Sequence, residues 1–365
     1  MESKKKVIFI FTLPPPIHGS AVVNQYIKDS LLINEAFDCD YINLSTSRNI
    51  REIGKYSPIK IWRIFGALCL LFLKLATKRY DLCYLAITCH GIGFLKDAPF
   101  VMLCKLFRNK IVIHQHNKGM SNDVDRWPYK WLLPIVYKNT RVILLSWRLY
   151  PDIEKVVSRE NVFICPNGIP EISYEYKNRH NDIPHLFFLS NLIESKGVLV
   201  LLDALKILRD KGFSFLCFFI GGETKEINRV RFEKEVENRN LQGNAMFEGR
   251  AYGTEKDKYF VSADIFVFPT FYHNECFPLV LLEAMQQRLP IVTTREGAIP
   301  DIVKDGENGF LCEKNNPKSL ADCIEKLLVD ETSRLNFGER GFVKYSKEYT
   351  IQTFEKRIIE ILQIN

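Results

Sequence analysis

The segment ADIFVFPTFYHNECFPLVLLEAM (Ala263–Met285) combines an apolar run, a loop and a second apolar run, and carries two glutamates eight positions apart. The first run predicts a buried strand that ends at Pro269. Pro278 predicts the first position of a helix, because its missing N–H and fixed φ suit that position. Glu275 then lies in the loop. Glu283 lies about one turn into an apolar helix, where a carboxylate is costly unless a polar group binds it.

The start of this helix is a candidate anion site. The backbone N–H groups of Phe277, Leu279 and Val280 have no partners in a helix that begins here, and helix N-termini attract anions. A carboxylate on each side of the site can hold hydroxyl groups. The pattern therefore suits a phosphate that is linked to sugars, as in a nucleotide sugar.

This arrangement resembles the E-x7-E motif of the retaining glycosyltransferases of family 4, which have the GT-B fold. The resemblance extends over nearly the whole chain and keeps the family's order and spacing. The other matching segments are VIFIFTLPPPIHGS (Val7–Ser20, the first loop), CPNGI (Cys165–Ile169, the domain junction), LFFLSNLIESKGV (Leu186–Val198, the donor-phosphate loop) and GAIPDIVKDGENGFL (Gly297–Leu311, a late helix and turn). Each match is weak alone, and together they favour the family strongly.

The resemblance implies roles for individual residues. Lys196 would contact the donor diphosphate at the start of a helix, Glu275 the donor sugar, and Glu283 the ribose. His116, just past a strand, matches a family histidine near the donor sugar. Gly19 matches a glycine that lets the backbone approach the donor phosphate or the acceptor. The alternatives are a solvated lysine, a structural histidine and a plain turn.

Asn191 departs from the family pattern, which usually has an arginine at this position. That arginine and the lysine together normally replace a metal ion in stabilising the leaving diphosphate. Asn191 donates hydrogen bonds but carries no charge, so either Lys196 and the helix N-terminus suffice or Arg250, after a strand, supplies a second cation. We expect no metal and no cofactor. His114 and His116 could suggest a metal site, but no third ligand has suitable spacing.

Strand patterns alternate with helical patterns along the whole chain, which predicts two doubly wound parallel sheets. The expected fold class is α/β with GT-B architecture: two Rossmann-like domains facing a cleft. We expect an acceptor-side domain at 1–175, onto which the C-terminal helix (350–365) crosses back, and a nucleotide-sugar domain at 176–349. The polar segment Ser173–Pro184 is the expected linker. The predicted strands are Val7–Thr12, Cys39–Leu44, Leu82–Ala86, Ile111–His114, Val142–Leu145, Val162–Cys165, Leu186–Leu189, Ser214–Ile220, Ala245–Glu248, Ile265–Pro269, Ile291–Thr294 and Gly309–Leu311.

Composition is ordinary for a soluble globular protein, and we expect this one in the cytoplasm. The chain has 365 residues, 47% of them apolar, and ten cysteines with no C-x2-C pair, which we expect to be reduced. No stretch reaches the ~18 apolar residues of a membrane span. Residues 1–180 carry 26 Lys and Arg against 15 Asp and Glu, whereas residues 181–365 carry 24 against 28. The basic half could face nucleic acid, an anionic membrane or a phosphorylated acceptor, or form a solvated basic surface.

One apolar segment bears on the choice among these partners. Ile61–Leu73 is apolar nearly all round and has basic residues at both ends. It is too short to cross a bilayer, and it predicts either a buried helix or a helix resting on an anionic membrane. We expect peripheral association with the inner face of the membrane and no binding of nucleic acid.

The sequence therefore predicts a retaining, metal-independent glycosyltransferase in surface polysaccharide biosynthesis. The expected donor is a UDP-sugar, with GDP-mannose second, and the expected acceptor is a saccharide or lipid-linked saccharide. A nicotinamide-dependent oxidoreductase is disfavoured, because the first loop lacks G-x-G-x-x-G. A GT-B sugar-nucleotide epimerase, a glycogen-phosphorylase-like enzyme and a non-catalytic GT-B partner in a polysaccharide assembly complex remain alternatives.

Overall fold

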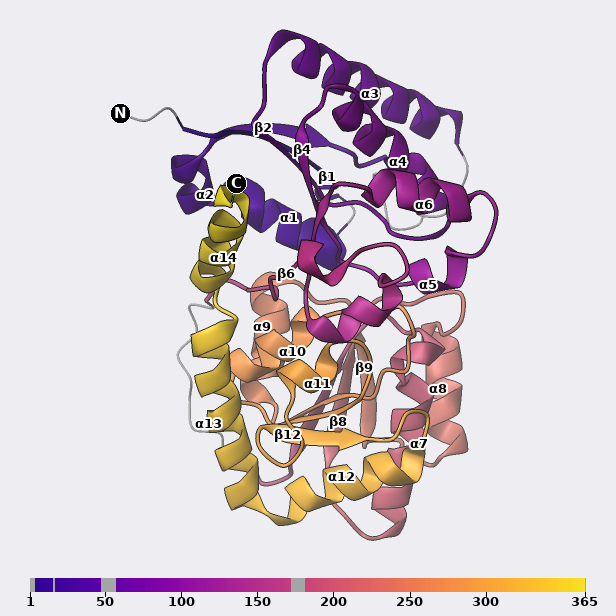
Figure 1. Ribbon diagram of the computed structural model, residues 1–365. Helices are drawn as coiled ribbons and strands as arrows, with labels where there is room; N and C mark the ends of the chain where they lie inside the picture. Colours follow the sequence, from indigo (N-terminus) through magenta and orange to yellow (C-terminus); the bar gives the residue numbers. More distant parts are fainter. Residues whose placement is uncertain (1–3, 16, 47–56, 172–180, 365) are drawn as a thin grey trace. The chain divides into compact units, whose positions relative to one another are not determined.

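The computed structural model describes residues 4–15, 17–46, 57–171 and 181–364 (Figure 1). The chain forms two units: Met1–Gly168 with Ile351–Asn365, and Ile169–Thr350. The expected boundary at residues 175 and 176 lies outside the described residues, and so does most of the expected linker Ser173–Pro184. Each unit is built on one parallel sheet.

The sheet of unit 1 has the strand order β2-β1-β3-β4-β5-β6, and all neighbouring strands run parallel. Its strands are β1 (Lys6–Phe11), β2 (Asp38–Asn43), β3 (Leu82–Leu85), β4 (Lys110–His114), β5 (Arg141–Leu144) and β6 (Val162–Ile164). Its α-helices are α1 (Gly19–Asp29), α2 (Leu31–Ala36), α3 (Pro58–Thr77), α4 (Gly91–Leu106), α5 (Met120–Asp123), α6 (Tyr129–Tyr137) and α14 (Ile351–Gln363).

Strand order decides which helices share a face of this sheet. The steps from β2 to β3, β3 to β4 and β4 to β5 all move in one direction, so right-handed crossovers place α3, α4 and α6 on one face. The step from β1 to β2 runs the other way and places α1 and α2 on the opposite face. There α14 packs against α2 (Figure 1). The Nζ of Lys5 donates to the carbonyl of Leu362 (3.1 Å).

The sheet of unit 2 has the strand order β12-β11-β10-β7-β8-β9, again all parallel. Its strands are β7 (His185–Leu189), β8 (Leu216–Ile220), β9 (Ala245–Gly249), β10 (Ile265–Phe268), β11 (Ile291–Thr294) and β12 (Gly309–Cys312). Its α-helices are α7 (Val198–Asp210), α8 (Arg229–Asn238), α9 (Gly253–Ser262), α10 (Leu279–Gln286), α11 (Ile299–Ile302), α12 (Pro317–Val329) and α13 (Glu331–Glu348).

All twelve predicted strands are present, with bounds that differ by no more than two residues. Strands buried on both faces need nearly continuous apolar residues, and the central strands are fully buried, which is why the apolar runs located them well. The two units are therefore two doubly wound α/β sheets, as the alternating pattern predicted.

Helix α3 differs from an ordinary covering helix. Ser57 precedes it and Pro58 opens it, but only Leu71 and Leu75 are buried along its 20 residues. Trp62 and Phe65 are more than half exposed. The interpretation of the segment as a wholly buried helix is therefore wrong. No helix among the described residues is long and apolar enough to cross a membrane.

Candidate functional site

The carboxyl edge of the unit 2 sheet gathers the predicted donor-site residues, since parallel strands end their loops on the same edge. The loop after β7 is tied to the loop after β10 by a hydrogen bond from Phe271 N–H to Ser195 O (2.8 Å). Gly197 has φ +87°, and a Cβ there would lie 2.3 Å from the carbonyl oxygen of Pro269. Only glycine therefore lets these two loops come so close.

Lys196 and Glu275 form an ion pair between these two loops. The Lys196 Nζ contacts the Glu275 Oε2, and the side chains are only 16% and 12% exposed. The ammonium also lies 4.7 Å from the ring centre of Tyr272 and 5.6 Å from that of Phe268. The structure thus joins two residues predicted separately, and the interpretation of Lys196 as a solvated surface lysine is wrong.

Glu283 has a cation of its own. It lies on α10, and its Oε1 is 2.7 Å from the Nζ of Lys256, on α9. Burial raises the pKa of the Glu283 carboxyl, and Lys256 opposes that rise. The polar partner required for a carboxylate among apolar neighbours is therefore Lys256, which the sequence analysis did not identify. A lysine 27 positions earlier carries no signal that it faces this glutamate.

The start of α10 differs slightly from the prediction. The helix begins at Leu279, and Pro278 is its N-cap (φ −68°, ψ 117°), so the placement of Pro278 as the first helical residue is wrong by one position. Among the described residues, no group accepts a hydrogen bond from the backbone N–H of Phe277, Leu279 or Val280. These three donors lie next to the loop that carries Glu275, as an anion site requires.

Asn191 and Arg250 meet at Gly222, in the loop after β8. The Gly222 N–H donates to the Oδ1 of Asn191 (3.1 Å). A Cβ on Gly222 would lie 2.5 Å from the Nε of Arg250 and 2.7 Å from the Oδ1 of Asn191, so both side chains lie directly against this glycine and a larger residue would displace them. Among the described residues, no carboxylate lies within ion-pair distance of Arg250. The fold thus places an uncompensated arginine close to the side chain that the family resemblance expected to be basic.

A second group of predicted residues lies at the carboxyl edge of the unit 1 sheet. His114 ends β4, and its Nδ1 lies 2.5 Å from the hydroxyl of Tyr84. The rings of His114 and His116 have centres 4.1 Å apart. Both ring nitrogens of His116 and the Nε2 of His114 are buried with no hydrogen-bond partner in the described part of the chain.

Burial governs the charge of these rings. It lowers the pKa of His116 to about 3, with His18 adding to the effect, and places the pKa of His114 well below its usual value, with His116 adding to the effect. Both rings are therefore neutral near pH 7. A neutral ring with two unpartnered nitrogens can both accept and donate a hydrogen bond to a ligand hydroxyl.

Gly19 is the first residue of α1, and nothing lies within 4 Å of the Cβ position at this residue. The helix is capped by His18, whose Nδ1 accepts hydrogen bonds from the Ala21 N–H (3.3 Å) and lies 3.0 Å from the Ser20 hydroxyl. The sequence analysis missed this cap, because histidine is not a usual N-cap residue. The role of Gly19 in ligand binding stays a prediction.

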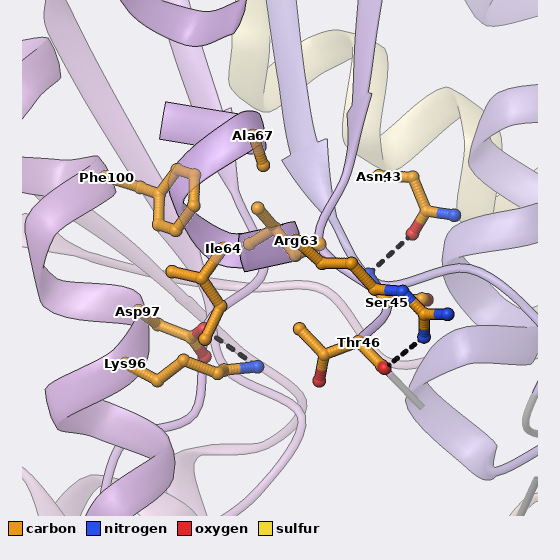
Figure 2. A pocket seen from close by; sticks show the side chains of 10 residues that line it. Asn43, Ser45, Thr46, Arg63, Ile64, Ala67, Lys96, Asp97 and Phe100 are labelled. Carbon is orange, nitrogen blue, oxygen red and sulfur yellow. Dashed lines mark hydrogen bonds and ion pairs between the residues drawn. The ribbon is translucent and has the colours of Figure 1, made fainter. Parts of the chain in front are cut away.

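A separate polar hollow lies at the end of β2, between α3 and α4 (Figure 2). Two cations enter it, but both have partners. Arg63 Nη1 donates to the carbonyl of Thr46 (2.7 Å), and Lys96 Nζ lies 3.1 Å from Asp97 Oδ1. Asp97 also accepts from the Thr88 N–H (2.9 Å). The hollow is therefore a polar junction that joins two helices to the sheet.

Among the described residues, no group of three or more His, Cys, Asp or Glu side chains has the geometry of a metal site.

Comparison with known proteins agrees with this layout. Residues 173–344, nearly all of unit 2, match the family model of the glycosyl transferases group 1. The chain is 28% identical to the capsular polysaccharide biosynthesis glycosyltransferase CapM of Staphylococcus aureus over 50% of this chain and 46% of that protein. The matched region thus spans about half the length of that relative.

Two further similarities extend over almost the whole chain. The lipopolysaccharide 1,2-N-acetylglucosaminetransferase of Salmonella typhimurium is 24% identical, with 97% of this chain and 98% of that protein aligned. The crystal structure of Anabaena HepE in complex with UDP superposes with a TM-score of 0.75 at 16% identity, covering 98% of this chain and 99% of that one. The chain therefore has the GT-B fold, with two Rossmann-like units, and its second unit matches the group 1 glycosyl transferases.

Proposed function

We propose that this protein is a retaining glycosyltransferase that takes a sugar from a nucleotide-sugar donor. The observation that carries the proposal is the Lys196–Glu275 ion pair beside the open N–H groups of α10. This arrangement puts a cation, three amide donors and a carboxylate at one sheet edge, inside the region that matches the group 1 glycosyl transferases. A diphosphate and the sugar attached to it need these groups.

The ion pair suggests how the donor is received. A diphosphate that approaches the amide donors of α10 competes with Glu275 for the ammonium of Lys196. Glu275 is then left close to the sugar, where its charge stabilises the positive charge that develops at the anomeric carbon. Arg250 supplies a second cation for the phosphates beside Asn191, and Glu283, paired with Lys256, binds the ribose hydroxyls.

In the transfer step, the bond between the anomeric carbon and the phosphate oxygen breaks, and an acceptor oxygen forms a new bond on the same face. The departing phosphate oxygen takes the proton of the acceptor hydroxyl, so the configuration is retained. Lys196, Arg250 and the N–H groups of α10 stabilise the leaving charge, and we expect no metal or cofactor. At the sheet edge of unit 1, His116 is neutral near pH 7 and can offer a hydrogen bond to a ligand hydroxyl.

We propose a UDP-sugar as the donor and a saccharide or lipid-linked saccharide of a surface polysaccharide as the acceptor. Three solved structures of Anabaena HepE contain UDP, UDP with glucose, or UDP-glucose. The relatives include enzymes named for capsular polysaccharide and lipopolysaccharide. GDP-mannose is the second choice of donor.

We further propose that unit 1 associates peripherally with the inner, anionic face of the membrane. The exposed apolar and basic surface of α3 supports this membrane association. None of the ten cysteines, all of them in the described part of the chain, forms a disulfide, as in proteins of a reducing compartment.

The test is a donor screen followed by a product analysis. UDP and GDP affinities are measured by calorimetry, and the sugars linked to the tighter nucleotide are then supplied with saccharide acceptors. The proposal expects transfer, with an anomeric configuration in the product equal to that of the donor by NMR. Nucleotide binding without turnover of any donor would instead favour a non-catalytic partner protein, and an inverted product would refute retention.

A further inference from the structure

Helices α3 and α4 leave an apolar groove between them on the outside of unit 1. The groove has a volume of about 900 Å³. It is lined by Leu68, Cys69, Phe72 and Leu73 from α3 and by Pro99, Met102, Leu103, Lys105 and Leu106 from α4. Leu106 is 73% exposed, and Phe72 and Leu73 are about half exposed. Monomeric proteins rarely leave a contiguous apolar surface of this kind open to water without a function.

The lining restricts what the groove can hold. Eight of the nine lining residues are apolar, and the exception, Lys105, has its ammonium engaged by the carbonyl of Lys138. No acidic residue lines the groove, so a polar ligand would lose hydrogen bonds with water without replacing them. The volume falls in the ~300–1,000 Å³ range of small-molecule sites. A flexible hydrocarbon chain meets these requirements.

The charge around the groove identifies the source of that chain. Residues 58–110, which carry both helices, contain nine Lys and Arg and two acids, Asp81 and Asp97. Asp38 and Asp40 of β2 pair with Lys74 and Lys78 of α3, so four acids stand against the nine basic residues. Asp81 accepts a hydrogen bond from the Lys6 N–H (2.7 Å) at the edge of the sheet, and Asp97 is buried. The exposed charge near the groove is therefore basic. It attracts an anionic bilayer and opposes a second copy of the same face.

The neighbouring surface fits a bilayer as well. Trp62 and Phe65 on α3 are largely exposed, and Trp131 on α6, on the same face of the sheet, is 63% exposed. Tryptophan side chains gather where a protein meets the headgroup region of a membrane, because their rings have an apolar body and a polar N–H. The apolar groove thus opens on a face that carries interfacial side chains.

We propose that the groove between α3 and α4 takes up one acyl chain of an anionic membrane phospholipid. This inference rests on the proposed membrane association and adds its mode: the unit captures a lipid chain in addition to being attracted by charge. Charge attraction is screened by salt, with a Debye length of about 8 Å at physiological ionic strength, whereas a buried chain is not. The groove therefore accounts for a part of the binding that persists at high salt.

The test uses the unmodified full-length protein and vesicles of phosphatidylcholine and phosphatidylglycerol, with a photoactivatable diazirine in the middle of the phosphatidylglycerol acyl chain. After irradiation at low and at high salt, peptides carrying lipid are identified by mass spectrometry. We expect adducts on groove residues of both helices, including Leu68–Leu73 and Pro99–Leu106, and their survival at high salt. Adducts restricted to Trp62 and Phe65, or no adducts, would overturn the inference.

A matched pair of variants provides the second measurement. Cys69→Trp fills the groove, whereas Leu31→Trp adds the same side chain at a 77% exposed site on α2, on the other face of the sheet. We expect Cys69→Trp to lower vesicle binding at high salt at least fivefold and Leu31→Trp to leave it unchanged. Equal binding by both variants would overturn the inference. UDP affinity, measured on the same samples, reports on unit 2 separately, so loss of the lipid result alone leaves the donor site standing.

Discussion

The candidate residues at the carboxyl edge of the unit 2 sheet are charged, whereas the histidines at the carboxyl edge of the unit 1 sheet are neutral. In unit 2, Lys196 faces Glu275 and Lys256 faces Glu283, so both glutamates have a cationic partner, and Arg250 is the candidate that has no carboxylate within ion-pair distance in the described part of the chain. In unit 1, His114 is buried and both ring nitrogens of His116 are buried; both rings are neutral near pH 7, and the Nδ1 of His114 lies 2.5 Å from the Tyr84 hydroxyl. The comparison teaches that the unit 2 candidates can exchange an ionic partner, as the proposed donor site requires, whereas the unit 1 histidines can offer hydrogen bonds without charge.

The largest effect should come from removing the charge of Glu275. Glu275→Gln keeps the shape of the side chain but cannot stabilise positive charge at the sugar, so kcat should fall by about 10²–10³, as when one electrostatic group is removed from an active site. UDP affinity should hold or rise, because a carboxylate near the phosphates is gone. Steady-state kinetics and calorimetry measure the two quantities.

The companion variant Glu283→Gln should mainly weaken UDP binding, because Glu283 is placed for the ribose. It also leaves Lys256 unpaired, so Glu283→Gln combined with Lys256→Met serves as the control for that side effect. Equal loss of UDP affinity in Glu275→Gln and Glu283→Gln would contradict the division of roles.

Lys196→Ala should weaken UDP binding about 100-fold. The variant removes a cation from the phosphates and leaves Glu275 unpaired at a mostly buried site, which is costly. Lys206→Ala is the matched control, because it breaks a lysine–aspartate pair on the exposed face of α7, where such pairs contribute roughly 0–1 kcal/mol. Unchanged nucleotide affinity in a folded Lys196→Ala protein would remove the central assignment.

Acid should destabilise unit 1 through its histidines. The pKa of His116 is about 3 in the native protein and near 6.5 when unfolded, so the unfolded chain binds the additional proton between these values. The contribution of the neutral His116 ring to the free energy of unfolding is therefore fully present above pH 6.5 and is lost as the pH falls toward 3. From pH 8 to pH 5 the loss is about 2 kcal/mol for one such group. Urea unfolding of the wild type and of His116→Gln checks this, and an equal loss in both would count against a neutral buried ring.

Arg250→Ala should weaken UDP binding by at least about tenfold, since a charge-assisted hydrogen bond contributes roughly 1.5–3 kcal/mol and each ~1.4 kcal/mol is a factor of ten. Because Arg250 and Asn191 meet at Gly222, the double variant Asn191→Arg, Arg250→Ala should recover part of the lost affinity. The exposed Arg295, paired with Asp305 after β11, provides the control substitution. A double variant no better than Arg250→Ala would show that the two positions do not share a ligand.

The smallest expected effect is that of metal removal. The cations of unit 2 are proposed to stabilise the leaving diphosphate without a metal ion, so EDTA should leave the rate of transfer unchanged. The sequence has two Asp-x-Asp pairs that could suggest metal ligands, Asp38 with Asp40 and Asp123 with Asp125, and both lie in unit 1. There Asp40 is engaged by Lys74, Lys78 and Tyr80. Activity abolished by EDTA and restored by Mn²⁺ would refute this expectation.

The sequence predicted the strands well and the side-chain partnerships poorly. A parallel strand buried on both faces must be apolar over its length, so its signal is local. The pairing of Lys196 with Glu275 joins positions 79 apart, and that of Lys256 with Glu283 depends on how α9 lies against α10. These contacts are created by the fold, and no local pattern encodes them.

Helix α3 shows the same limit for surfaces. Its residues are apolar nearly all round, and this pattern cannot distinguish a helix surrounded by protein from one that keeps half its apolar residues uncovered. The distinction depends on how much of α3 its neighbour α4 covers, and the open groove between them is the result. Similarly, the sequence named Arg250 as a candidate second cation, but its position beside Asn191 at Gly222 is created by the fold.

The chain enters and leaves unit 2 at adjacent points. Ile169 pairs with Thr350 in a parallel bridge, its N–H donates to Tyr349 O (3.0 Å), and its carbonyl accepts from the Tyr345 hydroxyl (3.2 Å). In genetic terms, unit 2 is an insertion into unit 1 whose first and last residues lie side by side. Closing a short loop costs little entropy, so the insert can be excised or circularly permuted with a short connection between its ends, and exchanging it between related proteins requires only two adjacent junctions.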